Sequence, residues 1–232
     1  MTGDEYELTE ADYDRFAGEQ KRGMIAPQHP MLGQVAQAVP LGEIASPRIQ
    51  TAITRLREIA TDQRRVTREA RRRRTLVGLA APQIGEPYRI VLLDTKVDES
   101  RRHYGRLECF INPEIVWRSR ETIEGREGCF STGPVWGAVR RPVAVKIRGL
   151  DAQGRPQERI LEDFSARIAC HEIDHLDGIR FPERITSDKK RHWVHTEELQ
   201  DYPEQYPRWK RLCTLQRWHD YATGNANVPV KK

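Results

Sequence analysis

The chain has 232 residues, a length that suits one domain or one domain with extensions. Its formal net charge is +5 and 38% of its residues are hydrophobic, which is enough for a core if the chain ends stay solvated. No apolar run approaches the ~20 residues that cross a bilayer, and the acidic start MTGDEYELTEADYDRF has no apolar stretch of the kind found in secretory signals. We therefore expect a cytoplasmic protein whose four cysteines are reduced, either as small buried residues or as thiolate ligands.

The first third of the chain contains one well-marked helix. Residues 1–22 are acidic and lack apolar periodicity, so a frayed or weakly docked arm is expected there. A helix is predicted after Ser46 and Pro47, because apolar residues recur on one stripe from Ile49 to Ile59. The arginine-dense stretch at 64–75 indicates either a solvated helix end or loop, or a contact for phosphates.

The middle of the chain is predicted to form strands followed by one helix. Branched apolar residues indicate a buried strand at 87–94, and further strands are expected within 108–117 and 120–131. Alternating apolar residues before a turn at Asp151 to Gly154 predict a hairpin within 140–156. A helix is expected within 165–181, and this order of elements favours an α+β domain.

The tail is polar and aromatic. Residues 207–222 fit a basic amphipathic helix that either packs onto the domain or docks to a partner. Its expected apolar face comprises Trp209, Leu212, Leu215 and Trp218.

The sequence ACHEIDHLDG at 169–178 carries the strongest chemical signal. His171 and His175 are four residues apart, so on a helix they share a face and can bind one cation. Glu172 lies at the edge of the same face, where its carboxylate could take a proton from a water molecule at the site. A chance match on a solvated helix is the alternative. Gly178 makes a natural helix end.

A catalytic metal site needs a third protein ligand and a position left open for water. A histidine three residues after Gly178 is excluded, because Phe181 stands there. The downstream segment HWVHTEEL offers His195, Glu197 and Glu198. Cys129, between Gly128 and a segment with turn-forming residues, is the other open choice, unless it is only a buried strand cysteine.

Three stretches in order resemble the three motifs of the peptide deformylase family: GLAAPQIG at 78–85, EGCFS at 127–131 and HEIDHLDG at 171–178. INPEIV at 111–116 and RRPVAVKIRGLD at 140–151 also resemble that family. The likeness implies an α+β deformylase fold, with antiparallel or mixed sheets around a central metal-binding helix. We expect an acidic arm at 1–24, a catalytic domain at 25–186 and a polar, aromatic extension at 187–232.

The resemblance also implies roles for individual residues. It assigns the metal to Cys129, His171 and His175. It assigns the acid/base role to Glu172, the oxyanion contacts to the Gln83 amide and the Phe130 backbone N–H, and the substrate contacts to Gly78, Leu79 and Trp136. Small residues at 78, 80 and 81 would leave room for an acyl group, whereas close strand packing would be the favoured explanation if the other motifs were absent. The family typically uses Fe²⁺, with Zn²⁺, Ni²⁺ or Co²⁺ as alternatives.

The implied reaction removes the N-formyl group from the N-terminal formylmethionine of nascent chains and releases formate. The implied partners are N-formylmethionyl peptides and, through basic surface, the ribosome; we expect a monomer or weak dimer with no membrane contact. Three other readings stay open: hydrolysis of a specialised non-ribosomal N-formyl compound, endopeptidase activity with a downstream acid as ligand, and an inactive ribosome-associated module.

The sequence departs from the family pattern at three positions. Leu76 stands where the first motif usually has glycine, and Trp136 stands where many relatives carry a polar or basic residue near the bound peptide. Cys170 stands where glutamine usually precedes the first histidine. Because it is about 100° around the helix from His171, we expect Cys170 to pack in the core rather than face the metal.

Overall fold

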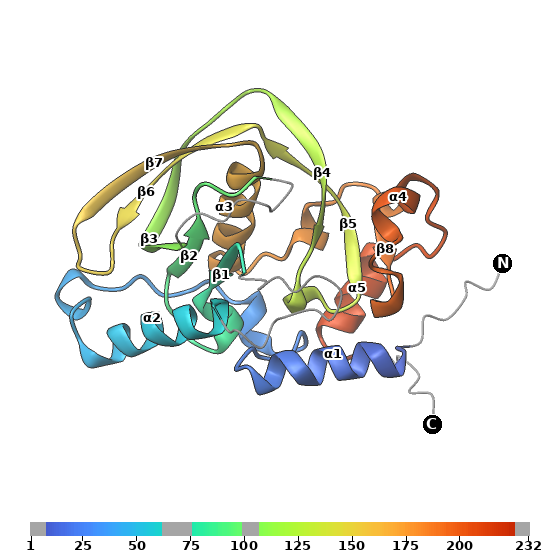
Figure 1. Ribbon diagram of the computed structural model, residues 1–232, viewed down its shortest axis with the longest axis horizontal. Coiled ribbons are helices and arrows are strands. Elements are labelled where there is room, and N and C mark those ends of the chain that lie inside the picture. The colour runs from blue at the N-terminus through green and yellow to red at the C-terminus, as the bar shows by residue number, and fades with distance from the viewer. Residues whose placement is uncertain (1–7, 62–75, 99–106, 226–232) are drawn as a thin grey trace. The chain divides into compact units, whose positions relative to one another are not determined.

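The computed structural model describes residues 8–61, 76–98 and 107–225 (Figure 1). The arginine-dense stretch at 64–75 lies outside these residues, so its expected phosphate contact stays a prediction. The chain forms two compact units. The core unit comprises Gly33–Ile123 and Arg141–Ile179, and the terminal unit comprises Met1–Leu32, Glu124–Arg140 and Arg180–Lys232.

The core unit contains an antiparallel sheet in the order β1-β2-β3-β6-β7. Its strands are β1 (Gly78–Ala80), β2 (Ile90–Asp94), β3 (Leu107–Arg118), β6 (Ala144–Leu150) and β7 (Pro156–Glu162). Strands β6 and β7 form the expected hairpin, with Lys146 opposite Ile160. Its turn closes where Asp151 N–H donates to the Arg155 carbonyl at 2.9 Å, and Gly154 supplies a φ of +80°.

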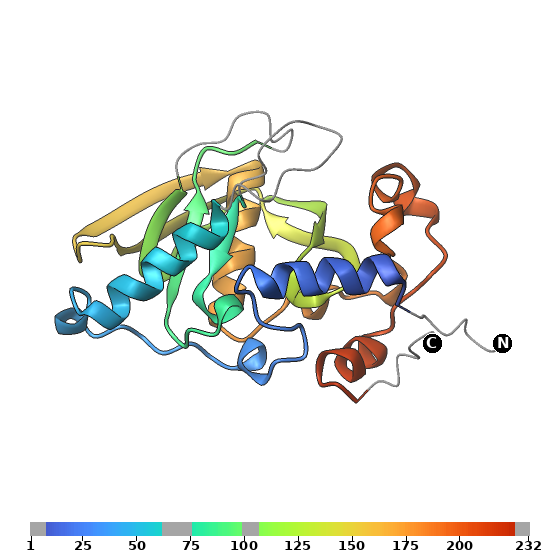
Figure 2. The same ribbon diagram turned by 60° about the horizontal axis from the view of Figure 1, so that its bottom comes forward.

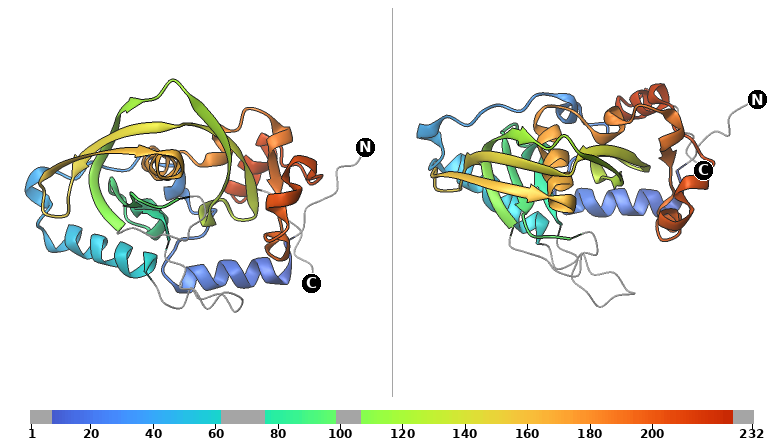
Figure 3. Two further views of the ribbon diagram at one scale, coloured as in Figure 1. Left: turned by 45° about the horizontal axis from the view of Figure 1, so that its top comes forward. Right: turned by 90° about the horizontal axis from the view of Figure 1, so that it is seen from above.

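Two helices cover opposite faces of strands β1 and β2. Helix α2 (Pro47–Ala60) begins as predicted, because the Ser46 hydroxyl accepts from the Ile49 N–H at 3.4 Å. Helix α3 (Asp163–Leu176) lies on the other face, as the left view of Figure 3 shows. Figure 2 shows α2, in cyan, across the same strands. All five residues of β2 are buried, as expected for a strand with a helix on each face.

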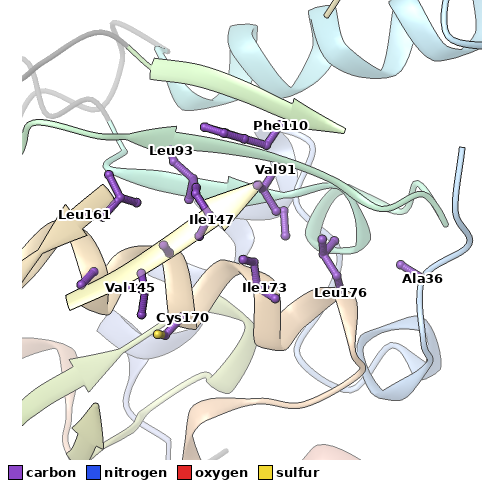
Figure 4. Packing of buried hydrophobic residues seen from close by; sticks show 13 residues of the cluster. Ala36, Val91, Leu93, Phe110, Val145, Ile147, Leu161, Cys170, Ile173 and Leu176 are labelled. Atoms are coloured by element: carbon purple, nitrogen blue, oxygen red, sulfur yellow. The ribbon is translucent and has the colours of Figure 1, made fainter. Parts of the chain in front are cut away.

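The core cluster lies between α3 and the sheet (Figure 4). Val91 and Leu93 alternate toward it from β2, and Ile173 and Leu176 reach it from α3. Cys170 belongs to this cluster with 5% of its surface exposed. The expectation that Cys170 packs in the core is therefore confirmed.

The terminal unit holds most of a second sheet, in the order β4-β5-β8. Its strands are β4 (Thr122–Gly128), β5 (Val135–Pro142) and β8 (Arg191–Trp193), and the helices of the unit are α1 (Glu10–Lys21), α4 (Tyr202–Gln205) and α5 (Leu215–Ala222). Short 3₁₀ helices in the two units are η1 (Pro30–Gly33), η2 (Leu41–Glu43), η3 (Ala81–Ile84), η4 (Phe130–Thr132), η5 (Phe181–Arg184), η6 (Asp188–Lys190), η7 (Thr196–Glu198) and η8 (Tyr206–Arg208). Among the residues described, no helix combines the length and apolar character needed to cross a membrane.

Both ends of the chain differ from the sequence expectation. Residues 1–7 of the acidic start lie outside the described residues, and Glu10–Lys21 form helix α1. This helix is docked rather than frayed, because Asp12 is fully buried and accepts hydrogen bonds from the Thr196 N–H at 2.8 Å and the Thr196 hydroxyl at 2.7 Å. The tail helix is shorter than predicted and begins only after Thr214, whose hydroxyl accepts from the Arg217 N–H. Leu215 is 40% exposed, and the buried face of α5 is formed by Trp218, Tyr221 and Ala222.

Candidate metal centre

Helix α3 carries both histidines and the glutamate of the HEIDH motif. All three side chains are buried, with exposed fractions of 9% for His171, 5% for Glu172 and 1% for His175. The two imidazole centroids are 5.0 Å apart with an interplanar angle of 82°, so the rings share one face as their spacing predicts. The motif is therefore not on a solvated helix.

Cys129, His171 and His175 form a group whose ligand atoms all lie within 4.8 Å of one another. Within the described parts of the chain, this is the group of histidine, cysteine and acidic residues that could hold a metal ion. Three donors of one tetrahedral ion lie roughly 3.3 to 3.6 Å apart when the bonds are about 2.0 to 2.3 Å long. The group therefore fits a divalent cation after small side-chain shifts, and its thiolate and imidazole donors suit iron, cobalt, nickel or zinc.

The downstream residues considered as third ligands have other partners. His195 Nδ1 lies 2.9 Å from an Asp12 carboxylate oxygen. Glu198 accepts from the His195 backbone N–H at 3.0 Å, and Glu197 accepts from the Thr9 hydroxyl at 3.1 Å. The contacts of His195 with Asp12 and of Glu197 with Thr9 hold this segment at helix α1 and its N-cap. The third ligand that the endopeptidase alternative requires is therefore not supplied by this segment.

A tight turn fixes the backbone of Cys129. The Cys129 carbonyl accepts from the Thr132 N–H at 3.1 Å and from the Thr132 hydroxyl at 2.8 Å, which closes η4 directly after the cysteine. The half-buried Cys129 side chain packs against the apolar cluster of Val139, Phe181 and Ile185. The position that sequence reasoning excluded as a ligand, Phe181, thus packs against the cysteine instead.

Gly78 is in close contact with Glu172. An added Cβ at Gly78 would lie 2.5 Å from Oε1 and 2.7 Å from Cγ of Glu172, far inside ordinary contact distance. The absence of a side chain on β1 therefore provides the space that the carboxylate occupies. Close packing does explain this glycine, but it is packing against an acidic side chain of α3.

Gln83 is held in one orientation by its own segment. The Ala80 backbone N–H donates to Gln83 Oε1 at 2.7 Å across the 3₁₀ helix η3, and the side chain is 3% exposed. Because the amide oxygen of Gln83 accepts this hydrogen bond, the amide N–H₂ group points away from Ala80 N–H, and its chemistry is that of a donor. Leu79 is 1% exposed and pairs with Leu92 in the sheet.

Trp136 packs within the terminal unit. Its ring lies against Gly128, where an added Cβ would be 2.4 Å from ring carbons. Its ring centroid is also 6.0 Å from that of Tyr202, at an interplanar angle of 64°. The extension therefore contacts the strand that follows Cys129, which the sequence pattern does not reveal.

Sequence reasoning also missed an ion pair on α3. Arg141 Nη1 lies 2.6 Å from Asp174 Oδ2, with side-chain exposures of 6% and 9%. Asp174 directly precedes His175, so this pair holds the helix at the second histidine. Arg141 is one of two adjacent arginines on β5, and the sequence gave no sign that it pairs with an aspartate 33 residues further along the chain.

Comparison with known proteins identifies the family. The model of the family described as Polypeptide deformylase matches residues 22–191. Peptide deformylase 2 from a Nostoc species is 40% identical over 114 residues, which are 48% of this chain and only 64% of that protein, so the match spans less than two thirds of it. Peptide deformylase from Desulforudis audaxviator is 38% identical over 146 residues, covering 59% of this chain and 90% of the relative.

A solved structure agrees with these matches. The Met-Ala-Ser-bound crystal structure of class I type b peptide deformylase from Acinetobacter baumannii aligns with a TM-score of 0.60 and 29% identity, covering 70% of this chain and 96% of that one. The expected α+β deformylase fold is thereby confirmed. With the family model matching well over half of its residues, this chain belongs to the polypeptide deformylase family.

Proposed function

We propose that the chain hydrolyses the N-formyl group of N-terminal formylmethionine on nascent polypeptides and releases formate. The observation that carries the proposal is the Cys129, His171 and His175 donor group, next to which Glu172 lies on helix α3. The Acinetobacter baumannii relative was crystallised with Met-Ala-Ser, which has the sequence of a deformylated N-terminus. By this proposal, Cys129, His171 and His175 hold one divalent ion, Fe²⁺ in the native protein.

The ion would polarise the formyl oxygen and bring the pKa of a water molecule toward neutrality. The Glu172 carboxylate accepts the proton of that water as its oxygen bonds to the formyl carbon. The carboxyl then gives the proton to the amine nitrogen as the C–N bond breaks. Water is thus added across the amide, and the products are formate and a free N-terminus. Gly78 leaves the Glu172 carboxylate the space this transfer needs.

The charge that develops on the formyl oxygen needs donors set in place beforehand. We assign this role to the Gln83 amide N–H₂ group and the Phe130 backbone N–H. The bond from Ala80 N–H to Gln83 Oε1 supports this assignment, because it fixes the amide before substrate arrives. Gly78 and the backbone of Leu79 would line the formyl end of the substrate, and Trp136 would lie beside the residues that follow methionine.

The cellular setting is part of the same proposal. We infer a cytoplasmic monomer or weak dimer that meets its substrate at the ribosome exit through basic surface, with the arm 1–24 and the extension 187–232 flanking the catalytic domain 25–186. The formal charge of +5 supports an anionic partner. Because phosphate contacts release counterions, binding to ribosomes should weaken steeply as salt rises. Binding that does not respond to salt argues against an electrostatic dock.

The decisive experiment is anaerobic purification, metal analysis, and measurement of formate released from formyl-Met-Ala-Ser, with acetyl-Met-Ala-Ser as the matched control. We expect about one metal ion per chain and formate release that a chelator abolishes and added Fe²⁺ restores. Glu172→Gln should retain the metal and lose activity by about 10²- to 10⁴-fold. A fully metallated protein that releases no formate overturns the proposal.

Trp136 is the reason to compare formyl-Met peptides directly with a second substrate class, specialised N-formyl compounds. This tryptophan replaces the polar or basic residue expected beside the bound peptide, and it packs against Tyr202 of the extension. Rates on formyl-Met peptides and on formylated small amines, measured side by side, separate a nascent-chain enzyme from one acting on a specialised N-formyl compound.

A further inference from the structure

We propose that helices α1 and α5, which lie outside the residues matched by the family model, are part of the working site, and that Phe16 and Tyr221 are positioning residues for the segment Cys129–Gly133. This inference rests on the proposed function of that segment, in which Cys129 is a metal ligand and Phe130 N–H is an oxyanion donor. Helix α1 ends at Lys21 and α5 begins at Leu215, whereas the family match runs from 22 to 191. All of the contacts below lie within the terminal unit.

The first contact comes from α1. The rings of Phe16 and Phe130 meet edge to face, with centroids 6.1 Å apart and an interplanar angle of 68°. Phe16 is 8% exposed and Phe130 is 9% exposed, so this pair is closed to solvent. Phe130 directly follows the candidate ligand Cys129, and the ring contact therefore restrains the residue whose backbone N–H is proposed to meet the oxyanion.

The second contact comes from α5. An added Cβ on Gly133 would lie 2.1 Å from the Tyr221 hydroxyl oxygen and 2.7 Å from its ring carbon Cζ. Gly133 also has a φ of +59°, in the region that favours glycine. The Tyr221 hydroxyl thus packs against the backbone at the end of the turn that Cys129 begins. The segment Cys129–Gly133 is therefore contacted by Phe16 near its start and by Tyr221 at its end.

Both helices are anchored, which a positioning role requires. Helix α1 is fixed through the fully buried Asp12, which contacts His195 and Thr196. Helix α5 is fixed through Trp218, whose ring centroid lies 4.6 Å from the guanidinium carbon of Arg180. Arg180 in turn donates from Nη1 to the Pro27 carbonyl at 2.8 Å.

Two arginines carry positive charge near Cys129. Arg15, one residue before Phe16, interacts electrostatically with both Cys129 and Tyr221. Arg180 interacts with the same two residues. Arg15 on α1 and Arg180, which directly precedes η5 (Phe181–Arg184), therefore add positive charge near the Cys129 segment, whereas α1 and α5 supply the aromatic rings that pack against it.

The test compares Phe16→Ala with Tyr13→Ala in the full chain. Tyr13 lies on the same helix with 37% of its surface exposed, so its removal matches the loss of an aromatic ring without touching Phe130. We expect Phe16→Ala to lower kcat about tenfold with KM within about twofold, because a displaced oxyanion donor acts mainly on the transition state. Tyr13→Ala should leave both constants unchanged, and Phe16→Leu should restore most of kcat.

A second readout does not depend on activity. Co²⁺ bound through the Cys129 thiolate gives a sulfur-to-metal absorption band, and we expect Phe16→Ala to weaken Co²⁺ binding at least about threefold, because an unrestrained ligand loses preorganisation. If the wild-type protein binds Co²⁺ with this band but releases no formate, the proposed function fails. The Co²⁺ affinity of Phe16→Ala relative to the wild type still tests the positioning role in that case.

Tyr221→Phe keeps the ring and removes only the hydroxyl that packs on Gly133, so it serves if Phe16→Ala fails to fold. It should lower kcat and Co²⁺ affinity in the same sense. Wild-type kcat and wild-type Co²⁺ affinity in a folded Phe16→Ala or Tyr221→Phe protein overturn the inference. An equal loss in Phe16→Ala and Tyr13→Ala also overturns it, since the effect would then belong to the helix and not to the ring contact.

Discussion

Replacement of Gly78 by alanine tests whether the position of the Glu172 carboxylate sets the rate. The added Cβ would lie 2.5 Å from Glu172 Oε1, whereas ordinary van der Waals contact begins at 3.4 Å. The carboxylate must therefore withdraw by 3.4 − 2.5, which is about 0.9 Å. The backbone of Gly78 does not have the positive φ that disfavours alanine, so strain in the main chain adds nothing to the effect.

A displacement of about 1 Å in a reacting group lowers a rate by about 10²-fold. We therefore expect Gly78→Ala to lower kcat about 100-fold, which corresponds to about 2.7 kcal/mol of activation free energy. The metal content should not change, because Cys129, His171 and His175 keep their places. The free energy of unfolding should fall by about 1 to 3 kcal/mol, the usual effect of an overpacked core position.

The assay is a double-mutant cycle for formate release with Gly78→Ala, Glu172→Gln and the combined variant. In the Glu172→Gln background, Gly78→Ala should change kcat by less than about threefold, because the group it displaces no longer takes the proton. Gly42→Ala is the matched control, since an added Cβ there meets no atom within 4 Å. Full activity in Gly78→Ala, or the same hundredfold loss in both backgrounds, refutes the reasoning.

Further outcomes follow from other contacts. Cys129→Ala should abolish metal binding by elemental analysis, whereas Cys170→Ala should retain the metal and lower the free energy of unfolding by about 1 kcal/mol, because Cys170 packs in the core. Arg141→Met leaves Asp174 buried without its guanidinium, and urea unfolding should show a loss of about 3 kcal/mol. Burial works to raise the pKa of Asp12, but hydrogen bonds to its carboxylate hold that pKa below its usual 3.8. The ionised Asp12 carboxylate therefore stabilises the fold fully above pH 3.8, and this stabilisation is lost as the pH falls through the lower pKa of the folded state. Unfolding of Asp12→Asn should lack this acid-dependent loss, and an identical pH profile for variant and wild type contradicts the assignment.

Elements with a strong local pattern could be predicted from the sequence. The stripe from Ile49 to Ile59 and the cap at Ser46 act within a few residues of each other, and α2 follows them closely. The orientation of Cys170 follows from helix geometry alone, because one residue along a helix turns about 100° away from His171. The shared helix face of His171 and His175, the two candidate ligands, rests on the same rule.

Features that depend on distant partners could not be predicted. Asp12 looks like one more acid in a charged arm, and its burial depends on His195, which lies 183 residues away. The tail shows a similar conflict between pattern and context. Apolar spacing suggested a helix face containing Leu212 and Leu215, but the helix starts after the Thr214 cap. Leu212 therefore lies outside the helix, where it forms an isolated β-bridge with His192 and has 41% of its surface exposed.

The motif GLAAPQIG shows both cases within eight residues. Gln83 is oriented by Ala80, three positions earlier, so the geometry of this proposed donor is set within its own 3₁₀ segment. Gly78 has no such local reason in its backbone, because its φ lies outside the left-handed region that favours glycine. What demands glycine is the Glu172 side chain, which belongs to a helix 94 positions further along the chain. The small residue at position 78 therefore reflects the position of a charged side chain on another element, and Gly78→Ala tests the proposed role of Glu172 rather than the strand on which Gly78 lies.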